Sequence, residues 1–189
     1  MSANATSLQY QVDPATSRLT LKVTASGMLS AMGHNPTIAV SDYAGEATAA
    51  PDDLQQATLR LTVKANSLEV TDDVSRKDKD EIESKMKQEV LETSRYPEIT
   101  FESSAVSPTK LGDTQYAVNL TGNLTLHGVT KSQSVTCQVS LNGDAIRAYG
   151  EFTIKQTDFG IRLVSVAGGA LKVKDEVKCA FDITMKRQA

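Results

Sequence analysis

Two histidines are the side chains in this sequence that come closest to acid–base or metal chemistry. His34 lies in residues 32–36, at an expected loop or strand entrance, and His127 precedes Gly128 at an expected turn. A zinc site or a general acid–base pair would need further ligands around them, typically three or four in all. The sequence has no His-Glu-x-x-His, Cys-x-x-Cys or Gly-x-Ser-x-Gly motif. We therefore expect each histidine to make a hydrogen bond at a turn or rim, with a contact to the polar end of a ligand as the alternative.

The two cysteines, Cys137 and Cys179, fall at apolar positions of alternating segments. Two cysteines are too few for a disulfide scaffold, and a free thiol at such a position behaves as a small hydrophobic side chain. We expect both to be buried, reduced and slow to react, with a disulfide between them as the alternative.

The segment Asp158-Phe159-Gly160 matches the tripeptide with which protein kinases hold magnesium. No glycine-rich loop or catalytic-loop motif accompanies it in the sequence. We interpret Asp158 as a residue that caps a loop by accepting hydrogen bonds from backbone amides, and Phe159 as a plug at one end of the fold. We expect no cofactor, no metal and no enzymatic activity.

Size and charge narrow the class of protein. The chain has 189 residues, of which 40% are hydrophobic and 23% charged, with a formal net charge of −3. This length suits one domain with a sizeable core. The sequence shows no basic cluster for nucleic acid or an anionic membrane, and no apolar run near the roughly 20 residues that span a bilayer. Residues 1–8 lack the pattern of a signal peptide, so we expect a cytoplasmic protein, or a periplasmic one if a leader has been removed.

Most of the sequence alternates between apolar and polar residues with a period of two. Leu19, Leu21 and Val23 alternate with polar residues, and the same pattern recurs in residues 59–65, 118–126, 135–141, 146–154 and 177–185. Such alternation indicates antiparallel strands with one buried and one solvated face. Asn142-Gly143-Asp144 separates two of these segments and predicts a hairpin.

Residues 74–92 break this rhythm and predict one amphipathic helix. Ile82, Met86 and Val90 fall four apart on one helical face. Asp72, Asp73 and Ser75 suit its start, and Pro97 marks the end of the segment. The expected ion pairs on the polar side are Lys77/Glu81, Glu81/Lys85 and Glu83/Lys87. We expect this apolar stripe to lie against the strands and to close the barrel that they form. The alternative is that the stripe lies at the entrance of a ligand site.

About eight strands and one helix favour an extended, up-and-down antiparallel β-barrel over a β-sandwich. Aromatic residues make up only 5% of the chain and tryptophan is absent. The inward positions carry mostly Val, Leu, Ile and Ala, together with Gly122 and Gly150. A barrel of this size either packs its interior with side chains or holds one small ligand. The composition is compatible with an elongated apolar cavity and also with a flattened, packed barrel.

Five short segments occur in a characteristic order: YQVDP at 10–14, GHN at 33–35, RYPEITF at 95–101, GNLTLHGVTK at 122–131 and TDFGI at 157–161. Together they resemble the YceI family of lipid-binding bacterial proteins. The resemblance spans residues 10–185 and implies a lipocalin-like barrel with a helix beside it, usually in a homodimer. It also implies a long-chain isoprenoid or similar amphiphile inside the barrel. We expect one domain over residues 10–189, after an N-terminal tail at residues 1–9.

Three functions remain open at this point. The first is a protein that binds an isoprenoid or fatty-acid derivative for transport, storage or sequestration; the second is a lipid-modifying enzyme. The third is a packed barrel without a ligand that serves as a protein-interaction or stress-related module. We expect the first, with a ligand site formed by Leu21, Val23, Met28, Met32, His34, Leu61, Val63, Met86, Phe101, Leu120, Leu124, Val135, Val139, Phe152, Ile154, Phe159, Phe181 and Ile183.

Overall fold

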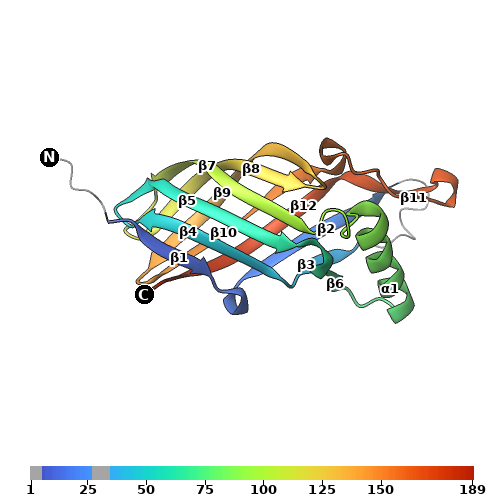
Figure 1. Ribbon diagram of the computed structural model, residues 1–189, viewed down its shortest axis with the longest axis horizontal. Helices are drawn as coiled ribbons and strands as arrows, with labels where there is room; N and C mark the ends of the chain where they lie inside the picture. The colour runs from blue at the N-terminus through green and yellow to red at the C-terminus, as the bar shows by residue number, and fades with distance from the viewer. Residues whose placement is uncertain (1–5, 27–34) are drawn as a thin grey trace.

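The computed structural model describes residues 6–26 and 35–189, and these form a closed antiparallel barrel with one α-helix at one end (Figure 1). Eight strands close the barrel, because β1 pairs with both β4 and β12. In barrel order they are β1 (Leu8–Val12), β4 (Tyr43–Ala50), β5 (Asp53–Lys64), β7 (Glu98–Lys110), β8 (Gln115–Leu126), β9 (Val129–Asn142), β10 (Ala145–Lys155) and β12 (Leu171–Arg187). The predicted fold class is confirmed. β1 begins at Leu8, within the segment expected as a tail.

At the helix end the sheet splits. The short strands β2 (Arg18–Ser26), β3 (Thr37–Val40) and β6 (Leu68–Val70) form a side branch in which β2 pairs with β12, and β3 joins β2 to β6. Two 3-10 turns, η1 (Pro14–Thr16) and η3 (Ala65–Ser67), lie where the chain passes from barrel to branch. The remaining short elements are η5 (Gln156–Phe159), β11 (Ser165–Val166) and η6 (Ala167–Gly169).

The helix lies against the side branch. The amide of Val70 in β6 donates a hydrogen bond of 2.8 Å to the carboxylate of Glu83. Figure 1 shows α1 (Arg76–Lys85) at the end of the barrel away from the two termini. No helix in the described ranges is long and apolar enough to cross a membrane.

The predicted helix is shorter and less regular than expected. Ser75 caps α1 by accepting from the amide of Asp78, as its position suggested. After Lys85 the chain continues as a π-helix, η4 (Met86–Val90). The helical segment therefore lies close to the expected bounds of about 74–92, but only its first part is α-helical. Among the expected ion pairs, Glu83/Lys87 is present at 3.8 Å. Glu81 makes no ion pair within the described residues. Two pairs that were not expected, Lys79–Glu83 and Lys85–Glu89, form on the helical segment instead.

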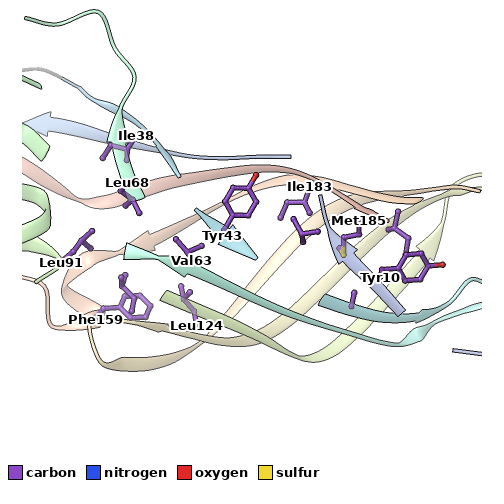
Figure 2. Packing of buried hydrophobic residues seen from close by; sticks show 14 of the residues in the cluster. Tyr10, Ile38, Tyr43, Val63, Leu68, Leu91, Leu124, Phe159, Ile183 and Met185 are labelled. Atoms are coloured by element: carbon purple, nitrogen blue, oxygen red, sulfur yellow. The ribbon is translucent and has the colours of Figure 1, made fainter. Parts of the chain in front are cut away.

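Buried apolar side chains run along the whole barrel (Figure 2). Tyr10 and Met185 lie at one end, Ile183 lies further along, and Leu91 and Phe159 lie at the helix end. Tyr10 and Phe159 are each only 2% exposed. The end away from the helix is therefore filled with side chains, which leaves the helix end as the place for an opening.

Gly122 shows how a small inward residue can serve packing rather than open space. A Cβ atom at this position would overlap the ring of Phe101 and approach the carbonyl oxygen of Glu102 to 2.5 Å. The glycine therefore lets the ring of Phe101 lie against β8. Gly150 is similar, since its Cβ would come within 2.8 Å of the carbonyl oxygen of Thr136. Neither glycine adds room to the interior, although small residues at inward positions are compatible with an elongated cavity.

Candidate functional site

The barrel contains an apolar cavity of about 520 Å³. This volume lies within the range of roughly 300–1,000 Å³ that is usual for ligand pockets. The walls come from β2, β3, β5, β6, β7, β8, β9, β10 and β12, and the helical segment α1–η4 supplies Ile82, Met86 and Val90. Glu81, an exposed residue of α1, also lines the cavity. The cavity therefore reaches the protein surface beside the helix, and the packed barrel is excluded as an architecture.

Most of the predicted ligand-site residues lie in the wall of this cavity. They are Leu21, Val23, Leu61, Val63, Met86, Phe101, Leu120, Leu124, Val135, Phe152, Ile154, Phe181 and Ile183. Val139 and Phe159 do not line it; both belong to the apolar packing around it. Met28, Met32 and His34 lie outside the described residues.

The sequence pattern missed several wall residues, for two different reasons. Leu19, Val177 and Cys179 share the inward phase of predicted neighbours and could have been included from the alternation alone. The apolar–polar alternation does not mark the polar residues of the wall. They include Asp78, Glu81 and Lys85 on α1 and Gln156 at the start of η5. These polar groups give the cavity a hydrophilic part near the helix end.

The two expectations for the helix stripe are met together. Met86 is only 8% exposed, and Leu91, which follows η4, has the same exposure. Both also line the cavity, together with Ile82 and Val90. The stripe therefore covers the end of the barrel and forms part of the cavity wall at the same time.

His127 fixes the end of the helical segment to the barrel. It occupies the β8–β9 hairpin with a φ of 51°, followed by Gly128 with a φ of 73°. Its Nε2 lies 2.5 Å from the carboxylate of Glu92, and its Nδ1 lies 3.2 Å from the carbonyl oxygen of Phe159. The imidazole also packs on the ring of Tyr96, with the centroids 4.5 Å apart. The expected hydrogen bond at a turn is confirmed, and it joins three segments at the helix end.

Substituting His127 by alanine is expected to reduce the free energy of unfolding by about 2–4 kcal/mol. The variant loses two side-chain hydrogen bonds and places alanine at a positive φ, which costs about 1–2 kcal/mol by itself. His127→Asn is the matched control, because asparagine tolerates this backbone conformation. Urea unfolding followed by circular dichroism measures both variants. If both variants lose the same free energy of unfolding, the loss comes from the contacts of the imidazole ring. Wild-type stability in His127→Ala would contradict the role given to His127.

Asp158 does not cap the η5 turn. The carboxylate that bonds to this turn is that of Asp175 in β12, which accepts hydrogen bonds of 2.9 Å from the amide of Thr157 and 2.6 Å from its hydroxyl. These hydrogen bonds lower the pKa of the Asp175 carboxyl. The expectation for Asp158 is wrong because the carboxylate comes from a strand distant in sequence.

Both cysteines are buried and free, as predicted. Burial raises the pKa of the Cys137 thiol to about 11 and that of the Cys179 thiol to about 12. The cavity wall includes Cys179 but not Cys137.

Labelling of the native protein by a maleimide at neutral pH is expected to be slow at both thiols. The reactive thiolate is suppressed at each site and the reagent has to enter the barrel. A time course followed by mass spectrometry, with the urea-unfolded protein as the control, measures the rate. Stoichiometric labelling of the folded protein as fast as that of the unfolded chain would contradict the burial of these thiols.

No group of three or more His, Cys, Asp and Glu side chains within residues 6–26 and 35–189 is arranged to hold a metal ion. Among the described residues that line the cavity, no histidine lies beside the carboxylates. The cavity is mainly apolar, with a few polar groups in its wall.

Residues 10–185 match the family model described as the YceI-like domain. The chain belongs to the YceI-like family. Among its relatives, a UPF0312 protein of Shewanella baltica is 28% identical over 169 residues, which cover 86% of this chain and 81% of the relative. UPF0312 proteins of Pseudomonas aeruginosa are 39% identical over 79 residues. A Pseudomonas putida relative is 36% identical over 80 residues, and this match spans only 38% of each protein.

Solved structures share the fold of this YceI-like protein. BcnA of Burkholderia cenocepacia superposes with a TM-score of 0.69 and 23% identity over 92% of this chain and 98% of that one. A polyisoprenoid binding domain from Saccharophagus degradans gives a TM-score of 0.70 and 18% identity over 96% and 99% of the two chains. A YceI protein of Campylobacter jejuni gives a TM-score of 0.59 and 17% identity, over 83% of this chain and 87% of that one. At these identities the likeness establishes the barrel and leaves the ligand to be argued from the cavity.

Proposed function

We propose that this YceI-like protein binds a long-chain apolar or amphiphilic molecule, an isoprenoid or fatty-acid derivative, and transports, stores or sequesters it. The observation that supports this most is the apolar cavity of about 520 Å³ that reaches the surface beside α1. An apolar cavity with one opening suits a chain-like ligand, whose tail lies among the aliphatic side chains while its polar end stays near the opening.

Burial of the tail supplies the affinity. Moving apolar surface from water into a cavity contributes about 25 cal/mol per Å². A chain that buries about 300 Å² therefore gains about 7 kcal/mol before the costs of immobilisation are subtracted. The aliphatic wall makes few directional contacts, so it is expected to accept tails of somewhat different shape.

Two further observations support binding over catalysis. One structural neighbour is itself described as a polyisoprenoid binding domain. The described wall of the cavity holds carboxylates, one lysine and one glutamine, without a histidine or an activated nucleophile among them. General acid–base catalysis needs a group that exchanges protons near the operating pH, next to the reacting atoms.

The purified protein is expected to carry an apolar molecule or to take one up. Mass spectrometry of an organic extract identifies a molecule that copurifies. For uptake, the neutral dye N-phenyl-1-naphthylamine should gain fluorescence in the presence of the folded protein, and a long-chain lipid should displace it. Protein unfolded in urea is the control. An extract free of lipid together with no dye uptake by the folded protein would contradict the proposal.

The homodimer and the cytoplasmic location stay predictions. The first rests on the family resemblance, and sedimentation velocity at several protein concentrations tests it. A monomer at all concentrations would contradict the homodimer.

A further inference from the structure

Gln156 is a buried polar side chain in the wall of an apolar cavity. It is 8% exposed, and it lies at the first position of η5, directly after β10. A buried amide has two donors on nitrogen and an acceptor oxygen, and leaving these groups unpaired costs free energy. The partners of this amide therefore indicate what chemistry the cavity offers.

An irregularity in β12 fixes the orientation of this amide. The pairing of β12 with β2 shifts register between Val173 and Val177, so Lys174 lies outside the regular ladder. The amide nitrogen of Gln156 donates a hydrogen bond of 2.9 Å to the carbonyl oxygen of Lys174. A carbonyl oxygen only accepts, so the nitrogen of the amide must face Lys174. The oxygen Oε1 is then the free end of the side chain. It accepts no hydrogen bond from the described residues, and since no side-chain oxygen there is both fully buried and unpaired, Oε1 borders open space.

The charged wall residues of α1 also act mainly as acceptors. Asp78 accepts the hydroxyl of Ser75, and Glu81 has no ion pair in the described part of the chain. The ammonium group of Lys85 lies 3.1 Å from the carboxylate of Glu89, which compensates its charge. Asp78, Glu81 and Lys85 together carry one net negative charge on the face of α1 that lines the cavity.

The helix end brings these groups to one end of the barrel. His127 contacts both Glu92, which follows η4, and the carbonyl oxygen of Phe159 in η5. The η5 turn with Gln156 and the helical segment therefore lie at the same end of the cavity. The opening beside Glu81 is at this end too, which is where the polar head of an amphiphile with its tail in the barrel has to lie.

We propose that the cavity selects amphiphiles whose head donates a hydrogen bond, such as a hydroxyl or an ammonium group, and that Oε1 of Gln156 accepts it. This inference rests on the proposed function, since it names the head of the ligand whose tail fills the barrel. A carboxylate or phosphate head would place further acceptors against Gln156 and a negative charge near Asp78 and Glu81, both of which are unfavourable. Gln156 is thus a specificity-determining residue of the ligand site.

The test compares four ligands that share one tail. Hexadecanol, hexadecylamine, palmitate and hexadecyl methyl ether compete with N-phenyl-1-naphthylamine for the full-length protein, each delivered in ethanol with ethanol alone as a control. Palmitate is expected to bind at least about tenfold more weakly than hexadecanol, because its head cannot donate at neutral pH. Palmitate that binds as tightly as hexadecanol, or more tightly, would overturn the proposal.

Gln156→Met assigns the effect to one residue, because methionine keeps the length of the side chain and offers no such acceptor. The affinity of hexadecanol relative to the methyl ether is expected to fall about fivefold to tenfold, with the ether little affected. An unchanged ratio would overturn the role of Gln156. If Gln156→Met does not fold, the comparison of ligands on the wild-type protein still decides the head group.

Glu81→Gln separates the two kinds of donor head. A loss of affinity for hexadecylamine alone supports an ammonium head, while unchanged binding of both donors supports a hydroxyl head. If the dye and all four ligands fail to bind, the proposed function itself is wrong. If they bind with equal affinity, the cavity binds lipids but the selection of the head group is wrong.

Discussion

Met86→Glu is expected to prevent the helical segment from docking on the barrel and to lower the free energy of unfolding by more than about 3 kcal/mol. Met86 is 8% exposed, and its neighbours in the cavity wall, Ile82, Val90 and Leu91, are all apolar. A carboxylate at this position would be buried without a partner, which is among the most destabilising changes known for protein interiors. Urea unfolding followed by circular dichroism and by dye binding measures the loss.

Two further substitutions separate charge from volume. Met86→Leu conserves volume and is expected to cost less than about 1.5 kcal/mol. Met86→Ala is expected to cost about 2 kcal/mol, the lower end for a buried large-to-small change, because one side of Met86 already borders open space. Wild-type stability of Met86→Glu, with and without a bound lipid, would show that the stripe does not lie against the barrel.

The barrel could be predicted because the pleat of a strand imposes its period on the sequence directly. Residues 177–185 alternate except at Ala180, and they lie within β12. The same rule marks β4 poorly, since after Tyr43 its inward side is made of Gly45, Ala47 and Ala49. Small residues give a weak alternation even where the strand is fully paired, so the sequence predicted the number of strands better than the position of each one.

The apolar part of the cavity could be predicted for the same reason, whereas the composition was compatible with both a hollow and a packed barrel. Inward phase assigns Leu61, Leu124 and Phe152 to the interior without any knowledge of the register. Whether such side chains meet across the barrel depends on the curvature of the sheet. The glycine that seats Phe101 illustrates this, because its effect depends on a contact between two strands.

The polar part of the site could not be predicted, because it depends on a local irregularity of β12 and on the width of the cavity at α1. Gln156 belongs to the site only because β12 is irregular after Val173 and presents the carbonyl of Lys174. On α1, the periodicity predicted a narrow stripe of Ile82 and Met86 with charges on the other side. The cavity is wider than that stripe and includes Glu81 and Lys85, which are adjacent to these residues in sequence and only about 100° away around the helix.

Leu61→Trp is expected to abolish tight binding of long-chain ligands while the barrel stays folded. Leu61 belongs to β5, lines the cavity and is only partly buried, so a larger ring enters open space rather than packed side chains. A ring that displaces about 100 Å² of ligand contact removes about 2.5 kcal/mol of affinity, or on the order of a hundredfold in Kd. Competition of hexadecanol with N-phenyl-1-naphthylamine measures the change.

The matched control is Leu111→Trp, which adds the same ring to an exposed leucine between β7 and β8 that is 57% accessible. This variant is expected to keep both the stability and the affinity of the wild-type protein. The free energy of unfolding of Leu61→Trp should fall by no more than about 1–3 kcal/mol below that of the wild-type protein, because the ring fills open space instead of forcing packed residues apart. Ligand affinity that survives in Leu61→Trp would place the binding site outside the barrel. A collapse of stability in this variant alone would mean that the interior is packed in solution, because open space accepts a ring and a close-packed core does not.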